Sequence, residues 1–151
     1  MIAVIQRVSN ANVKVKKIPI ASIEQGLLIL LGVEDADDNE DLNWLVKKIV
    51  QLRIFSDGEG KMNLSALDVQ AEFLVVSQFT LHAQTKKGNR PSFVKAAKPV
   101  FAEALYEDFI QELLSHSSRQ VQHGKFGADM QVSLTNDGPV TIIIDTKNKH
   151  L

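Results

Sequence analysis

Residues 73–81 read FLVVSQFTL, an apolar run that ends in three polar side chains, Ser77, Gln78 and Thr80. A short apolar run of this kind, bounded by polar residues, is typical of a buried strand. Polar groups at the end of a buried strand cost stability unless they find partners. This end of the strand is therefore the first candidate for a functional site.

A second unusual segment, residues 136–141, reads NDGPVT and places Gly138-Pro139 between two strand-like runs, 130–135 and 140–145. A proline cannot donate to a β-ladder, and a glycine weakens a strand. On pattern alone a hairpin turn at 136–138 is favoured over a cis bond between Gly138 and Pro139. We expect 73–81 and 136–141 to form one site.

The strands around these segments follow from apolar patterning. Residues 2–8 predict a largely buried strand, Asn10 to Asn12 a turn, and residues 13–16 a half-exposed second strand. The run LLILLGV, residues 27–33, is continuously apolar and predicts a central strand.

Two helices are predicted. The first is capped by Asp37 or Asp38, and its apolar stripe is Leu42, Leu45, Val46, Ile49 and Val50. The second begins at Pro99, and its stripe is Phe101, Leu105, Phe109 and Leu113. Strand runs separated by two helices, without strict alternation, favour the α+β class.

Composition bounds the organisation of the chain. Its 151 residues, 44% of them hydrophobic, fit one domain over residues 1–151 with a polar tail, 146–151, that we expect to fray. There is no cysteine, no signal-peptide pattern and no apolar run of about 18 residues. We expect a soluble, cytoplasmic protein without a membrane segment.

Charge is distributed unevenly although the net charge is only −1. Residues 34–41 hold six acids, which a solvated helix start explains, whereas residues 86–98 hold five bases and no acid. The basic run lies in a long polar segment, 82–98, directly after the polar-ended strand, which favours function or mobility.

Side-chain chemistry leaves several alternatives open. The four histidines lack paired-ligand spacing and cysteine is absent, so we expect no metal site. Ser77 lacks a GxSxG context, and Thr80 needs a base that the sequence does not supply. Both can be ordinary strand hydroxyls bonded to main chain. Alternatively, free main-chain N–H groups at the strand end stabilise an oxyanion.

Five segments, taken together, resemble the D-aminoacyl-tRNA deacylases over essentially the whole chain: MIAVIQRVSNANV (1–13), GLLILLGV (26–33), SQFTL (77–81), TKKGNRPSF (85–93) and KFGADMQVSLTNDGPVT (125–141). The resemblance implies hydrolysis of the ester that joins a D-amino acid, or glycine mischarged on tRNA(Ala), to the terminal adenosine. It also implies a homodimer with a compact, barrel-like α+β fold and no cofactor.

The resemblance assigns roles to residues that match its motifs. Ser77, Gln78, Phe79 and Thr80 match the catalytic SQxxT segment, with Phe79 acting through its main-chain N–H. Gly138 and Pro139 match a Gly-cisPro pair that enters the partner subunit's site and excludes L-amino acids.

Further matches concern orientation and tRNA binding. Arg7 matches the arginine that holds the Gly-Pro motif. The segment associated with the terminal adenine contains Phe126, Gly127 and Met130. By charge alone, three bases are candidates for phosphate contacts: Lys86, Lys87 and Arg90.

Two mechanisms and two functions stay open at this point. Water attack, stabilised by main chain at Phe79 and Thr80 and helped by the ribose 2′-OH, competes with covalent attack by Thr80. The alternative function is a noncatalytic module that binds a tRNA end or a small ligand.

Overall fold

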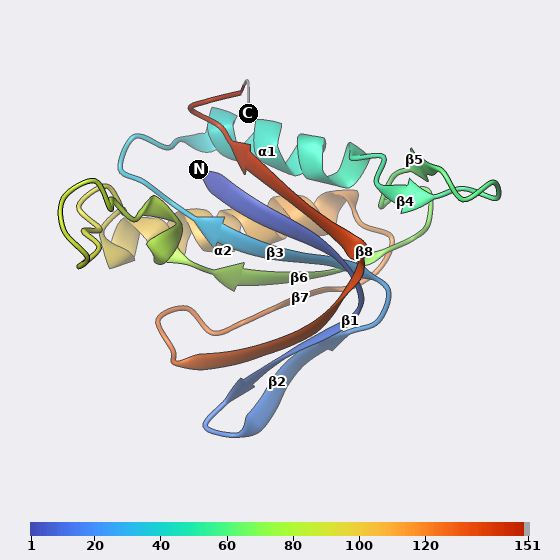
Figure 1. The fold of residues 1–151 in the computed structure, drawn as a ribbon, viewed down its shortest axis with the longest axis horizontal. Coiled ribbons are helices and arrows are strands. Elements are labelled where there is room, and N and C mark those ends of the chain that lie inside the picture. Colours follow the sequence, from blue (N-terminus) through green and yellow to red (C-terminus); the bar gives the residue numbers. More distant parts are fainter. Residues whose placement is uncertain (150–151) are drawn as a thin grey trace.

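A computed structural model describes residues 1–149 as one strongly curved sheet with two long helices against one side (Figure 1). The elements are β1 (Ile2–Val15), β2 (Ile18–Ile23), β3 (Gly26–Gly32), α1 (Asn39–Gln51), β4 (Phe55–Ser56), β5 (Met62–Leu64), β6 (Glu72–Ser77), the 3-10 helix η1 (Phe79–His82), α2 (Pro99–His116), β7 (Val121–His123) and β8 (Met130–Asp145). The α+β class and the nearly closed, barrel-like sheet are as predicted.

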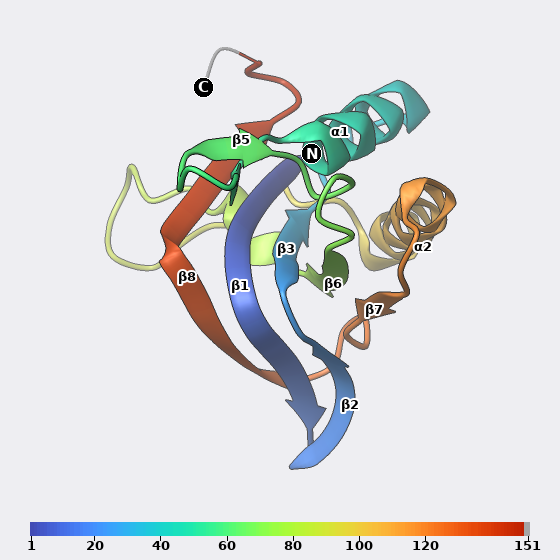
Figure 2. The same ribbon diagram turned by 90° about the vertical axis from the view of Figure 1, so that its right-hand side faces the viewer.

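The sheet has the order β2-β1-β3-β6-β7, and β8 pairs with the other side of β1. The β3–β6 and β6–β7 pairs are parallel, while β1 is antiparallel to β2, β3 and β8. Figure 2 shows the curvature, which brings β2 and β8 around toward β7. Separately, β4 and β5 form a small two-stranded sheet.

The predicted turn at Asn10 to Asn12 is wrong, because β1 runs unbroken to Val15. Asn12 lies between two strands, paired with Ser22 of β2 and Ser133 of β8. Long-range pairing on both sides overrides the local turn preference of asparagine. The chain turns instead at the positive-φ residues Lys16 and Lys17.

The predicted hairpin at 136–138 is also wrong. Residues 130–136 and 141–145 both pair with β1, so β8 is one strand interrupted by a bulge. Between the pairs Val8–Asn136 and Gln6–Thr141, β1 contributes only Arg7, whereas β8 contributes the four residues 137–140. The extra residues protrude from the ladder, as expected of an enlarged bulge.

The core explains the continuous apolar run of β3. Leu27, Ile29 and Leu31 face the core beneath the helices, while Leu28 faces a second cluster inside the curved sheet. A strand covered on both faces has no polar alternation. The central strand predicted at 27–33 is confirmed as β3.

Both helices begin where predicted. Asp38 caps α1, accepting from Asp41 N at 3.0 Å while Asp41 accepts from Asp38 N at 3.2 Å, and all five predicted stripe residues are buried. Pro99 is the first residue of α2. Its predicted stripe is buried except for Phe101, which is 41% exposed. The prediction for Phe101 is wrong, because in the first turn of α2 it is Ala102, one residue later, that is buried in the core.

The C-terminal segment, where the sequence predicts fraying over 146–151, makes specific contacts up to Lys149, whose Nζ lies 4.7 Å from the centroid of the Trp44 ring. The buried hydroxyl of Thr146 accepts from the amino group of Met1 at 2.6 Å. Lys147 Nζ donates to Asp41 at 2.5 Å. Residues 150 and 151 lie outside the described residues. No helix of residues 1–149 is long and apolar enough to cross a membrane.

Candidate active site

At the polar end of the FLVVSQFTL stretch, the backbone changes direction. The strand predicted to reach Leu81 ends at Ser77, and the chain turns into the 3-10 helix η1. The last ladder contact is Gln78 N to Leu31 O, at 2.8 Å, where β3 itself ends. The bonds from Leu81 N to Gln78 O and from Ala83 N to Thr80 O then close the tighter turns.

Two main-chain donors are left free at this turn. Among residues 1–149, neither the Phe79 N–H nor the Thr80 N–H has a hydrogen-bond acceptor. The first N–H groups of any helix lack an intrahelical partner, so the strand-to-helix change produces this pair of donors directly. Phe79 is 57% exposed, and its ring meets that of Phe93 edge-on at 5.1 Å.

The side chain of Thr80 is bonded to an amide rather than to a base. Gln78 Nε2 donates to Thr80 Oγ1 at 2.5 Å. A threonine hydroxyl becomes a nucleophile only when a neighbouring base takes its proton. In the described residues no carboxylate or imidazole bonds to this hydroxyl. The geometry therefore favours main-chain chemistry over a covalent role of Thr80.

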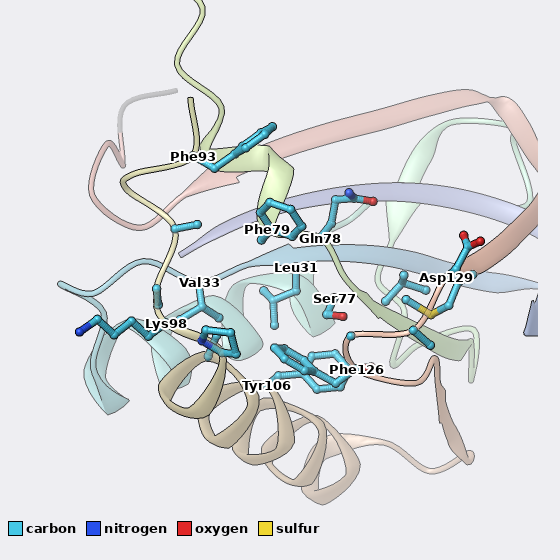
Figure 3. Close-up of a pocket in the computed structure, with 18 of the residues that line it drawn as sticks. Leu31, Val33, Ser77, Gln78, Phe79, Phe93, Lys98, Tyr106, Phe126 and Asp129 are labelled. Atoms are coloured by element: carbon cyan, nitrogen blue, oxygen red, sulfur yellow. The ribbon is translucent and has the colours of Figure 1, made fainter. Parts of the chain in front are cut away.

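An apolar cavity of about 680 Å³ opens beside these donors. Its walls come from the ends of β3 and β6, the segment 93–99, the first turns of α2 and the segment 126–132 (Figure 3). It contains six of the predicted site residues: Ser77, Gln78, Phe79, Phe126, Gly127 and Met130. Thr80 lies next to the cavity lining in sequence but is not part of it.

The cavity has charge only at Lys98 and Asp129, which lie toward opposite ends of it in Figure 3. Within residues 1–149 no group of three histidine, aspartate or glutamate side chains could hold a metal ion. Sequence reasoning missed Asp129 and treated Lys98 only as part of a basic run.

Tyr106 connects the cavity wall to the strand that ends in the site. Its hydroxyl donates to Val75 O at 3.0 Å, and Gly124 N donates to the same oxygen at 2.9 Å. Its ring lies 5.7 Å from that of Phe126. Burial raises the pKa of Tyr106 well above its ordinary value of 10.0, so the hydroxyl stays protonated. Sequence reasoning missed Tyr106 because helical spacing does not separate it from core residues of α2.

The side chain of Arg7 holds the Gly-Pro segment. Arg7 Nε donates to Asp137 O at 2.9 Å, and Nη1 donates to Ile54 O at 2.6 Å. A Cβ at Gly138 would lie 2.9 Å from Arg7 Nη2, and Gly138 has φ of 132°, so both space and conformation favour glycine. The Gly138–Pro139 bond is cis.

The two segments expected to form one site do not meet within one chain. Gly138 and Pro139 are exposed and do not line the cavity that contains Ser77 and Phe79. Asn136 closes their loop, since its Oδ1 accepts from Val140 N at 2.8 Å and its Nδ2 donates to Thr141 Oγ1 at 2.9 Å. The motif is thus presented outward.

The candidate phosphate contacts lie apart from the cavity. Lys86, Lys87 and Arg90 are exposed on the loop between Gln84 and Ser92, and none of them lines the cavity. The structure therefore brings the predicted residues together in three places: the cavity, the Arg7-supported bulge and this loop.

The fold and the site together define the class: an α+β protein with a nearly closed sheet and an apolar cavity, beside which lie main-chain N–H groups that have no acceptor among residues 1–149. The family model described as D-Tyr-tRNA(Tyr) deacylase matches residues 4–145. The chain belongs to this family, which confirms the resemblance found in the sequence.

Relatives agree with the assignment. The chain is 58% identical over 149 residues to the D-aminoacyl-tRNA deacylase of Flavobacterium psychrophilum, and 56% identical over 149 residues to that of Bacteroides fragilis, covering 99% of each chain in both cases. A solved structure titled c-Myc DNA Unwinding Element Binding Protein superposes with a TM-score of 0.92 at 43% identity, covering 96% of this chain and 98% of that one. A probable eukaryotic D-amino acid tRNA deacylase superposes with a TM-score of 0.80 at 17% identity, covering 95% and 97%, which supports the fold alone.

Proposed function

We propose that this protein is a hydrolase that cleaves the ester between a D-amino acid and the terminal ribose of tRNA. Family membership and relatives named D-aminoacyl-tRNA deacylase support the reaction. The observation that carries it is the pair of unpaired N–H groups, Phe79 and Thr80, beside a cavity of about 680 Å³.

In the proposed mechanism, water attacks the ester carbonyl and the two N–H groups stabilise the oxyanion that develops. Donors held in place before reaction cost no reorganisation, and losing one such donor typically lowers the rate by about 10²- to 10³-fold. The Gln78 bond to Thr80 Oγ1 supports a positioning role for both side chains. The neighbouring ribose 2′-OH assists the attack. When the intermediate collapses, the bond to the ribose ester oxygen breaks, and that oxygen takes the proton that the water has lost, which releases the free amino acid and the tRNA.

The terminal adenosine occupies the cavity in this proposal, against Phe126, Gly127 and Met130. These residues line the apolar wall that also carries the Tyr106 ring. A purine base matches such a wall because its faces are apolar and stack on aromatic rings. Lys86, Lys87 and Arg90 supply contacts to the phosphate backbone.

Chiral selection is proposed to come from a second copy of the chain. Gly138 and Pro139 face outward from their own subunit, and in a homodimer they would wall off the partner's site. A main-chain wall blocks the side chain of every L-amino acid without favouring any one of them. The contacts from Arg7 and Asn136 support the rigidity that such a wall needs.

The alternative is a noncatalytic module that binds the end of a tRNA. Incubation with D-tyrosyl-tRNA and L-tyrosyl-tRNA separates the two functions. We expect the protein to clear the first and spare the second, in keeping with a role in the cytoplasm, where aminoacyl-tRNA is used. Binding of both substrates without hydrolysis of either would establish the module instead.

A further inference from the structure

Residues 73–102 form an acid-free stretch of the chain, which supplies part of the cavity lining and contains all five bases of the basic run. Every one of them is exposed, and within residues 1–149 none is paired with a carboxylate. An unpaired group of like charges is the electrostatic signature of a surface that meets a polyanion. These bases are Lys86, Lys87, Arg90, Lys95 and Lys98.

Three of these bases lie on a protruding segment, residues 84–92, which we call the basic arm. Its ends are clipped together by Gln84 N to Ser92 O at 2.8 Å and Ser92 N to Gln84 O at 3.0 Å. Residues 85–91 are all exposed beyond this clip. Seven residues that run out and back reach at most about 12 Å. The arm projects from the body of the molecule in both Figure 1 and Figure 2.

The other two bases lie at the cavity rather than on the arm. Lys98 lines the cavity, and Lys95 precedes it in the segment that forms one wall. Two exposed aromatic rings belong to the same region: Phe79, 57% exposed, lines the cavity together with Lys98, and Phe101, 41% exposed, follows Lys98 by three residues. We call Lys95 and Lys98 the rim bases.

Composition separates the two surfaces. The basic arm reads QTKKGNRPS and contains no aromatic residue, whereas aromatic rings accompany the rim bases. Unpaired nucleotides are held by aromatic stacking together with positive charge. Double-helical RNA is held mainly through contacts to phosphates and 2′-hydroxyls, which need polar and basic side chains but no stacking platform.

We propose that the basic arm binds the backbone of the double-stranded acceptor stem of tRNA, while the rim bases bind the unpaired nucleotides that precede the terminal adenosine. The inference rests on the proposed function, because it takes the terminal nucleoside to occupy the cavity. The arm then lies farther along the tRNA than the rim, and it contributes affinity for whole tRNA over a short 3′ fragment.

The test compares two substrates, D-tyrosyl-tRNA and a CCA trinucleotide that carries D-tyrosine. The arm variant combines Lys86→Gln, Lys87→Gln and Arg90→Gln, and the rim variant combines Lys95→Gln and Lys98→Gln. A control that also removes three exposed positive charges combines Lys14→Gln, Lys47→Gln and Lys61→Gln, which lie on other elements. The readout is the ratio of kcat/KM for tRNA to kcat/KM for the trinucleotide.

We expect the arm variant to lower this ratio by about tenfold or more at low salt, and the control variant to leave it as in the wild type. The rim variant lowers kcat/KM for both substrates, so its ratio changes little. The arm proposal is overturned if the arm variant loses activity equally on both substrates, or if it loses none.

Binding of uncharged tRNA, followed by fluorescence anisotropy, separates this inference from the proposed function. Loss of up to three phosphate contacts should reduce the slope of log Kd against log salt concentration by about 2 to 3 in the arm variant. If the wild type cleaves neither substrate but shows this change in slope, the arm proposal holds and the deacylase proposal fails. Cleavage with an unchanged slope overturns the arm proposal alone.

Discussion

Arg7 of β1 donates from Nε to the main-chain oxygen of Asp137 at 2.9 Å, at the one position of β1 that faces the four-residue bulge of β8. Its Nη1 donates at the same time to Ile54 O. The guanidinium thus ties the Gly-Pro bulge to the connection after α1. The guanidinium can make both contacts because its three donor nitrogens lie in one plane, an arrangement that no other side chain offers.

We predict that Arg7→Lys loosens the bulge and reduces discrimination. A single ammonium cannot replace both contacts, and a buried carbonyl without a donor costs about 1–3 kcal/mol. L-tyrosyl-tRNA should then be hydrolysed faster relative to D-tyrosyl-tRNA, and the free energy of unfolding in urea should fall by that amount. Arg53→Lys is the control, since Arg53 also donates to a main-chain oxygen, that of Asn63, but at the surface. Unaltered selectivity in Arg7→Lys would contradict the proposed role.

Gly26 is required by the close approach of β3 to β6. A Cβ there would lie 1.9 Å from Glu72 O, the residue with which Gly26 is paired. We predict that Gly26→Ala lowers the free energy of unfolding by about 3 kcal/mol, because neither strand backbone can move aside. Gly58→Ala is the matched change, with no atom within 4 Å of its Cβ, and should stay within about 0.5 kcal/mol of wild type. Similar denaturation midpoints for the two variants would refute the requirement for glycine at position 26.

Strands β3 and β8 show which parts of the fold can be predicted from the sequence and which cannot. The burial of β3 on both faces and the capped stripe of α1 are local patterns, and both are predicted from the sequence. The bulge at 137–140 depends on the register with β1, more than 120 residues away, which no local pattern contains. Asparagine and glycine at 136–138 therefore predict a turn where the chain forms one strand with a protrusion.

The site, too, has a part that can be predicted from the sequence and a part that cannot. Residues 77–80 are predicted as a site by their polarity, but the turn into η1 depends on where β3 ends. Tyr106 belongs to the same buried face of α2 as Leu105 and Phe109, and only the cavity beside it distinguishes it. Residues that act through their place in a cavity carry no separate signal in a single sequence.

Asp41 should make stability depend on pH in the acid range. Burial raises the pKa of its carboxyl, but hydrogen bonds from Lys147 and from the Asp38 N–H outweigh this, so the pKa lies below its ordinary value of 3.8. A lowered folded-state pKa gives stability that is present above the unfolded-state value and is lost as the pH falls through the folded-state value. The stabilisation is therefore complete at neutral pH.

We predict that Asp41→Asn lowers the free energy of unfolding by about 1 kcal/mol above about pH 5, and that the difference from wild type shrinks below pH 4. Urea unfolding at a series of pH values measures it. Asp35→Asn removes an exposed carboxylate from the same acidic run and is the control. A difference for Asp41→Asn that stays constant down to pH 3 would show that the ion pair with Lys147 does not contribute.

Glycine tests the account of chiral selection by a main-chain wall. A wall that blocks the L side chain has nothing to block when the substrate is achiral, so glycyl-tRNA should be hydrolysed as well. Deacylation of glycyl-tRNA(Ala) over a range of enzyme concentrations, alongside D-tyrosyl-tRNA, checks this. If glycyl-tRNA resists excess enzyme while the D-substrate is cleared, selection requires contacts to the D side chain, and the wall is not sufficient.

Thr80 distinguishes the two mechanisms, because it carries both a free N–H and a hydroxyl. If the N–H stabilises the oxyanion, Thr80→Ala keeps that donor and loses only the bond from Gln78, so the single-turnover rate should stay within about tenfold of wild type. Thr80→Ser should behave in the same way. If the hydroxyl is the nucleophile, serine retains activity, whereas alanine abolishes it and still binds substrate. That split between the two variants, measured with D-tyrosyl-tRNA, would refute water attack supported by main-chain donors.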